Sequence, residues 1–202
     1  MLVWINGPFG GGKTAAGFEL HRRLPGSVVC DPEFVGYGLH RMLPPGERSD
    51  FQDLPAWRIG VHQMLDLTLR RHEGTVIVPM TLVDDGYFAE IVGRLRADGF
   101  DVRHFALLAD RATVLRRLRK RRLGGLVRDD FALGRLDDCL KQLRQPQFAE
   151  HLWTDRMSVP EVAEAIAGSA GLAIAGRSGP VRSRLEQAGT SLRHVRSWPL
   201  NG

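Results

Sequence analysis

The segment from Gly7 to Thr14 reads GPFGGGKT, the spacing G-x-x-x-x-G-K-[ST] of a phosphate-binding P-loop. Glycines let backbone N–H groups approach phosphate oxygens, and a helix that begins near Lys13 adds its N-terminal donors. Lys13 is then expected to reach the β- and γ-phosphates of ATP, while the Thr14 hydroxyl ligates Mg²⁺. A chance Gly-rich turn is the alternative. The expected nucleotide-binding residues are Gly7, Pro8, Phe9, Gly10, Gly11, Gly12, Lys13 and Thr14.

A second group that could do chemistry is Asp31, at the end of the apolar run Ser27–Asp31. In open parallel sheets ligands bind beyond the carboxyl ends of the strands, so Asp31 is expected at the same edge as the P-loop. There it could accept a proton from an attacking hydroxyl, or hold Mg²⁺ through water. Asp31-Pro32-Glu33 is also a good helix N-cap sequence, and capping and catalysis are compatible. Glu33 is a further candidate for substrate contact.

Arginines supply the third group. Arg117 and Arg121 lie one turn apart on a predicted helix that precedes a Gly-Gly loop, so they share a face. On a lid, such a pair would stabilise charge on a transferring phosphoryl group; a solvated basic face is the alternative. Arg58, beside Trp57, could face an acidic acceptor or occupy a surface position.

No Asp or Glu in the sequence is clearly placed to complete a Mg²⁺ site. The segment after the third predicted strand reads PMTLVDD, and its Asp84 and Asp85 are placed to cap the next helix.

Five apolar runs are predicted as strands, with helices between them. This alternation predicts right-handed crossovers and a parallel sheet covered on both faces. A Gly-rich linker, Gly168–Gly179, precedes a basic amphipathic helix from Pro180 to about Trp198, which either docks on the core or lies on a membrane surface. The predicted strands are Leu2–Asn6, Ser27–Asp31, Thr75–Thr81, Val102–Ala109 and a weaker one near FAEHLWTD.

Composition narrows the class of protein. The 202 residues suffice for one hydrophobic core, and the net charge of +5 comes almost entirely from arginine, since the lysines are Lys13, Lys120 and Lys141. Cys30 and Cys139 show no metal or disulfide spacing, which suits a reducing cytosol. We find no apolar run of transmembrane length and no signal peptide, so we expect a cytoplasmic protein with peripheral membrane contact through the tail helix.

Seven segments occur in this order along the chain: VWINGPFGGGKTAAGFELHRRL, CDPEFVG, DLPAWR, VIVPMT, IVGRLRADG, VLRRLRKR and TDRMSVPEVAEAIA. Together they resemble the tunicamycin-resistance P-loop family of bacteria, and the resemblance extends to about Leu172. It implies a cytoplasmic nucleotide-binding protein with a nucleoside-kinase-like fold, associated with resistance to the nucleoside antibiotic tunicamycin. It places the ATP site at Gly7 to Thr14 and the lid arginines at Arg117 and Arg121, whereas the lid sequence LGGLVRDDFALG departs from the family.

We therefore expect an α/β P-loop domain at residues 1–168, with strand order 2-3-1-4-5 and a lid at about 117–131, followed by the linker and tail helix at 169–202. The expected reaction transfers the γ-phosphoryl group of ATP to a hydroxyl of a nucleoside-type acceptor such as tunicamycin. The alternative is an ATP-gated protein that sequesters the drug at the membrane without chemistry. Nucleic acid is not an expected partner, because the arginines cluster on one helix and no aromatic stacking platform is visible.

Overall fold

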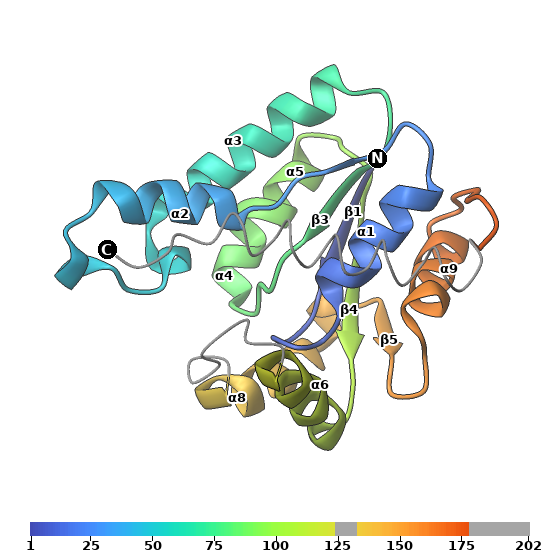
Figure 1. The fold of residues 1–202 in the computed structure, drawn as a ribbon. Helices are drawn as coiled ribbons and strands as arrows, with labels where there is room; N and C mark the ends of the chain where they lie inside the picture. Colours follow the sequence, from blue (N-terminus) through green and yellow to red (C-terminus); the bar gives the residue numbers. More distant parts are fainter. Residues whose placement is uncertain (124–132, 178–202) are drawn as a thin grey trace.

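The structure is a computed structural model that describes residues 1–123 and 133–177 (Figure 1). Most of the predicted lid and the whole predicted tail helix lie outside these described residues. Within them, the chain alternates strands and helices as the apolar pattern predicts.

Five parallel strands form one sheet in the order β2-β3-β1-β4-β5, which confirms the predicted order. Leu2 of the central strand pairs with Val76 on one side and with Val102 on the other. Because side chains alternate along a strand, Leu2 and Trp4 join one core cluster, and Val3 and Ile5 join the other. The strands are β1 (Leu2–Asn6), β2 (Val28–Val29), β3 (Val76–Pro79), β4 (Val102–Leu108) and β5 (His151–Trp153).

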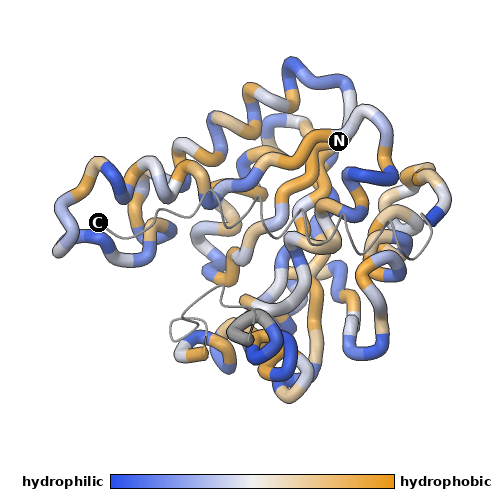
Figure 2. The backbone as a smooth tube through the Cα atoms, viewed as in Figure 1, coloured by the Kyte–Doolittle hydropathy of each residue, from blue (hydrophilic) through white to orange (hydrophobic). Residues whose placement is uncertain are grey.

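Helices cover both faces of the sheet. On one face α1 (Lys13–Arg23) packs beside α9 (Val159–Ser169) (Figure 1). On the other face lies α3 (Pro55–Arg71), with the continuous stretch of α4 (Asp85–Phe88), η3 (Ala89–Gly93) and α5 (Arg94–Ala97). Figure 2 shows the apolar strands enclosed between these layers. The remaining helices are α2 (Glu33–Met42), α6 (Arg111–Leu123) and α8 (Leu136–Leu143), with short 3₁₀ turns η1 (Pro45–Glu47), η2 (Phe51–Asp53) and η4 (Pro146–Phe148).

One helix differs from its prediction. The sequence predicts a single helix from Tyr87 to Gly99, whereas the structure has α4 (Asp85–Phe88), a π-helical turn η3 (Ala89–Gly93) and α5 (Arg94–Ala97). The Asp84 side chain accepts a hydrogen bond from the Tyr87 N–H at 2.9 Å, so the predicted cap is confirmed and the helix begins two residues early.

The predicted linker begins as a packed segment. Leu172 and Ile174 contact the cluster between α1 and α9, and the Ala175 N–H donates to the Arg23 carbonyl at 2.7 Å. Buried Arg23 in turn donates to the Ala175 carbonyl and to Glu164 of α9. The ordered unit therefore continues beyond residue 168, to at least Ala175. None of the helices within residues 1–123 and 133–177 combines the length and the apolar character that crossing a membrane requires.

Candidate active site

The P-loop connects the carboxyl end of β1 to α1, and three of its glycines, Gly7, Gly10 and Gly12, have a positive φ that other residues rarely adopt. Gly10 and Gly12 have φ of 76° and 94°, in the left-handed region. A Cβ on Gly10 would lie 2.8 Å from Cγ of Leu118, and one on Gly11 would lie 2.8 Å from the Pro8 carbonyl oxygen. The glycines of the motif are thus required by the conformation of the loop and by its contact with α6.

The start of α1 fits a triphosphate. The helix follows Gly12 with no side-chain cap and no acidic residue in its first turn, and the Ala16 N–H makes a helical hydrogen bond to Gly12 at 2.9 Å. N–H groups in the first turn of a helix have no intrahelical acceptor, and the helix dipole favours an anion there. By contrast, α9 begins with a capping box of Ser158 and Glu161. The uncapped end of α1 leaves its donors for phosphate oxygens.

Lys13 lies over the same loop. The side chain is half-buried rather than surface-accessible, its Nζ donates to the Pro8 carbonyl at 3.0 Å, and the ammonium lies 5.6 Å from the centre of the Phe9 ring. Thr14 follows it in the first turn, also half-buried. The positive charge is therefore held against the loop that would surround the phosphates.

The described residues provide few side-chain ligands for Mg²⁺. Across the described residues, no group of three or more His, Cys, Asp or Glu side chains is arranged to hold a metal ion. Asp84 serves as a cap, and Asp85 accepts a hydrogen bond from Gln147 at 2.9 Å. The residues fit a magnesium ion carried in with the nucleotide and held at Thr14, a site that has few protein ligands.

A buried clamp that the sequence did not reveal holds the first residue of the P-loop. Asn6 is fully buried, and its Oδ1 accepts from the N–H groups of Gly7 and Leu82, at 2.8 and 3.0 Å. Its Nδ2 donates to the Leu82 carbonyl at 2.6 Å and lies 3.1 Å from Nε2 of His104. The Thr81 hydroxyl donates to the Gly7 carbonyl at 2.8 Å. These bonds fix the entry of the loop against β4 and the segment after β3.

His104 completes this clamp as a neutral imidazole. Its Nδ1 lies 3.2 Å from the Ala149 carbonyl and can only donate to it, which leaves Nε2 to accept from Asn6. Burial lowers the pKa of His104 from 6.5 to about 4, because the imidazolium would be desolvated.

This buried histidine should make the protein acid-sensitive. His104 takes up a proton less readily in the folded protein than in the unfolded chain. Its contribution to the free energy of unfolding is therefore complete above pH 6.5 and is lost as the pH falls toward 4. The shift corresponds to about 3 kcal/mol in the free energy of unfolding. Urea unfolding at pH 7.5 and pH 4.5 measures the free energy of unfolding of wild type and of His104→Gln. This free energy should fall less between the two pH values in His104→Gln than in wild type. The exposed His21→Gln is the control, and equal losses in wild type and His104→Gln would contradict the assignment.

Asp31 and Glu33 lie where the sequence places them, directly after β2 at the carboxyl edge of the sheet. The Asp31 Oδ1 accepts from the Glu33 N–H at 2.9 Å, so the predicted capping contact is present. The Glu33 Oε2 accepts a hydrogen bond from the Tyr37 hydroxyl at 2.6 Å. Both carboxylates are half-buried, accessible to a ligand yet restrained.

Arg58 is held in a network of buried contacts. The buried side chain donates through Nε to Glu90 at 2.7 Å and through Nη1 to the Gln52 carbonyl at 2.6 Å, and it stacks 4.2 Å above the Tyr87 ring. Gln52 of η2 donates to the Thr81 carbonyl at 3.1 Å, which links this network to the P-loop clamp. These contacts give Arg58 a structural role, so substrate contact by this residue stays a prediction.

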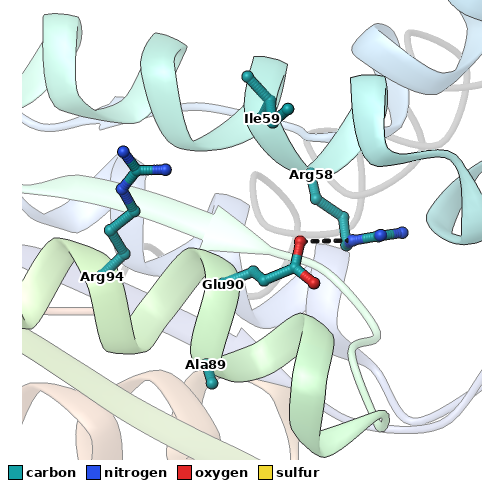
Figure 3. A pocket seen from close by; sticks show the side chains of 5 residues that line it. All are labelled: Arg58, Ile59, Ala89, Glu90 and Arg94. Carbon is teal, nitrogen blue, oxygen red and sulfur yellow. Dashed lines mark hydrogen bonds and ion pairs between the residues drawn. The ribbon is translucent and has the colours of Figure 1, made fainter.

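Next to the Arg58–Glu90 pair is an open depression of about 320 Å³, between α3 and the α4–η3–α5 stretch (Figure 3). It lies on the helical face rather than at the carboxyl ends of the strands, so we assign it no part in chemistry. The lining residues are Arg58, Ile59, Ala89, Glu90 and Arg94.

Arg117 reaches back from α6 to the P-loop. Its guanidinium lies 3.5 Å from the Gly11 carbonyl and donates to the Thr154 hydroxyl at 3.1 Å and the Thr154 carbonyl at 2.7 Å. Burial lowers the pKa of Arg117, although an arginine so placed is still charged at neutral pH. Arg121 belongs to the same helix, and its side chain lies outside the described residues. The structure thus joins Arg117 to the nucleotide loop and to the end of β5.

Comparisons with known proteins agree with this geometry. A family model described as AAA domain matches residues 2–146. The solved structure of the Deinococcus radiodurans tunicamycin resistance protein is 35% identical, with a TM-score of 0.73, and the match covers 87% of this chain and 99% of that one. No curated protein sequence matches the chain.

Two more distant structures are kinases. A gluconokinase from Sinorhizobium meliloti is 17% identical, with a TM-score of 0.60 and coverage of 84% of this chain and 91% of that one. The Mycobacterium tuberculosis APS kinase, solved with AMPPNP and APS, is also 17% identical, with a TM-score of 0.56 and coverage of 84% and 96%. At this identity the likeness shows the fold alone, a kinase-like P-loop fold.

Proposed function

The chain belongs to the P-loop family of the tunicamycin resistance protein, and from that premise we propose that it transfers the γ-phosphoryl group of ATP to a hydroxyl of a nucleoside-type acceptor such as tunicamycin. The family name identifies the drug, while the reaction is inferred from the residues at the sheet edge. ATP is the phosphoryl donor, and Mg²⁺ accompanies it.

One observation carries the proposal: a phosphate-binding loop and two restrained carboxylates share the same edge of the sheet. The P-loop follows β1, and Asp31 follows β2, with only β3 between these strands. Strands in a sheet lie about 4.8 Å apart, so the two strand ends are separated by roughly 10 Å. A carboxylate at the same sheet edge as the P-loop could accept a proton from an acceptor hydroxyl beside the bound phosphates, which favours phosphoryl transfer over ATP binding alone.

The proposed roles follow from the contacts. Lys13 and the first-turn N–H groups of α1 bind the phosphates, and the clamp on Gly7 keeps the loop from shifting. Asp31 takes the proton of the acceptor hydroxyl as its oxygen attacks the γ-phosphorus and ADP leaves. Mg²⁺, when bound at Thr14, neutralises charge on the β- and γ-phosphate oxygens.

Release of ADP tests this proposal. Wild-type protein with ATP and Mg²⁺ should release ADP much faster when tunicamycin is added, because the acceptor supplies the attacking oxygen. The rival function, sequestration without chemistry, predicts tunicamycin binding that AMPPNP supports as well as ATP, with no stimulated ADP release. That second outcome would remove the phosphotransferase and leave the P-loop assignment intact.

Arg117→Ala should reduce turnover more than ATP affinity. A guanidinium at the P-loop contributes most when charge moves in the transition state, and loss of one such donor typically costs about 10²–10³-fold in kcat. Steady-state kinetics and a calorimetric ATP titration measure the two quantities. Exposed Arg119→Ala, on the same helix, should leave both unchanged. Equal losses of turnover and affinity in Arg117→Ala would reduce the arginine to a ground-state binding residue.

Membrane contact belongs to this proposal as well. The predicted amphipathic helix lies outside the described residues. A cytoplasmic location and contact of this helix with the inner face of the membrane therefore stay predictions. We also propose that nucleic acid is not a partner of this protein.

A further inference from the structure

We propose that Tyr37 is a positioning residue that holds the Glu33 carboxylate ready to accept a hydrogen bond from a hydroxyl of the acceptor. This inference rests on the proposed function, and it adds the group that selects a hydroxyl-rich, sugar-type acceptor. Nothing in the motif pattern of the sequence pointed to Tyr37.

The contacts restrain Glu33 at two points. The Tyr37 hydroxyl donates to the Glu33 Oε2 at 2.6 Å, across one turn of α2. The Asp31 Oδ1 accepts from the Glu33 backbone N–H at 2.9 Å. The backbone of Glu33 is thus fixed by the proposed proton acceptor, and its carboxylate is fixed by a phenol.

The Tyr37 ring is itself held rigidly. It makes edge-on contacts with Phe34 and Phe51, at 6.4 and 6.3 Å between ring centres. The Phe51 ring occupies the space above Gly36, where an added Cβ would lie 2.5 Å from it. Buried Trp57 packs against Phe51 at 5.5 Å. The Trp57 indole N–H in turn donates to the Pro32 carbonyl at 3.0 Å, so the aromatic cluster is tied to the start of α2.

The phenol also stays protonated. Burial raises the pKa of Tyr37, and the negative charges of Glu33 and Asp31 raise it further. Tyr37 is therefore a permanent donor to Glu33, and the carboxylate keeps one orientation before any ligand arrives.

Such pre-orientation matters for selectivity. A carboxylate that is held in one orientation before binding favours acceptors that place a hydroxyl against it, because less conformational entropy is lost when the ligand binds. Glu33 lies two residues from Asp31, so it would accept from a hydroxyl near the one that is phosphorylated. Acceptors with neighbouring hydroxyls, as in sugars, match this arrangement.

The test compares Tyr37→Phe with a matched variant. Tyr37→Phe keeps the ring and its packing, and should raise the KM for tunicamycin about tenfold or more while the KM for ATP is unchanged. Glu33→Gln should do the same, and the double variant should be no worse than Glu33→Gln, because Tyr37 acts through Glu33. The control is Tyr87→Phe, which also removes a hydroxyl bonded to a carboxylate, that of Asp53 at 2.9 Å; its kinetics should match wild type.

A spectroscopic readout checks the contact without any acceptor. The chain has two tyrosines, so Tyr87→Phe leaves Tyr37 as the sole source of a tyrosine ¹³Cζ resonance. Adding Glu33→Gln should shift that resonance at neutral pH, because the phenol loses a charged acceptor. No shift, or a Tyr37→Phe variant with the wild-type KM for tunicamycin, would overturn the positioning role. Wild-type protein that binds ATP but shows neither turnover nor binding with tunicamycin would instead refute the proposed acceptor, and the recognition role with it.

Discussion

Replacing Lys13 with alanine is expected to abolish phosphoryl transfer and to weaken ATP binding about 10- to 100-fold, with the fold intact. A hydrogen bond to a charged group typically contributes about 1.5–3 kcal/mol, which corresponds to this loss of affinity. The half-buried side chain contacts its own loop through Pro8 and Phe9, at the protein surface rather than in the hydrophobic core, so we expect the fold to survive its removal. Calorimetric titration with ATP and Mg²⁺ measures the affinity, and thermal unfolding checks the fold.

Lys141→Ala is the matched control. This lysine lies on α8 with an exposed side chain, and its removal makes the same change of charge at a residue outside the Gly7–Thr14 motif. Wild-type affinity is expected for it. Wild-type ATP affinity in Lys13→Ala, together with unchanged resistance of cells to tunicamycin, would remove the assignment of Gly7 to Thr14 as a nucleotide site.

The second large effect is expected from Asp31→Asn. The substitution keeps an Oδ1 that can accept from the Glu33 N–H, so the free energy of unfolding should change by less than about 1 kcal/mol. It removes the negative charge that accepts the proton of the attacking hydroxyl. General-base assistance is typically worth about 10²–10⁴-fold, so turnover should fall by that factor at near-normal ATP affinity.

Asp84→Asn separates capping from catalysis. Asp84 caps α4 through the Tyr87 N–H at the same 2.9 Å distance, and asparagine preserves that bond. Turnover and melting temperature should stay near wild type. If Asp31→Asn folds, binds ATP and still protects cells fully against tunicamycin, Asp31 has no catalytic role and sequestration becomes the better account.

The fold was accessible from the sequence because its signals are local. The five apolar runs, the Gly-rich loop and the capping residues are each contained within a few positions, and the strand order follows from the P-loop family. The Glu33–Tyr37 bond is also local, at a spacing of four residues, and could have been found by examining helix-face pairs.

The clamp on the P-loop was missed for a physical reason. Asn6 binds Leu82 and His104, which lie 76 and 98 residues away, and no periodic pattern encodes such pairs. The available signal was a polar residue within each of two largely buried strands, Asn6 at the end of β1 and His104 inside β4. Arg58 shows the same difficulty, since its partner Glu90 lies 32 residues away and turns an apparent surface arginine into a buried one.

Mass spectrometry of tunicamycin after incubation with the protein, ATP and Mg²⁺ shows whether the drug is the phosphoryl acceptor. With wild-type protein, tunicamycin should gain the mass of one phosphoryl group, and Asp31→Asn should give little or none of this product. Tunicamycin recovered unmodified from wild-type protein that demonstrably binds both ATP and the drug would contradict the proposed transfer.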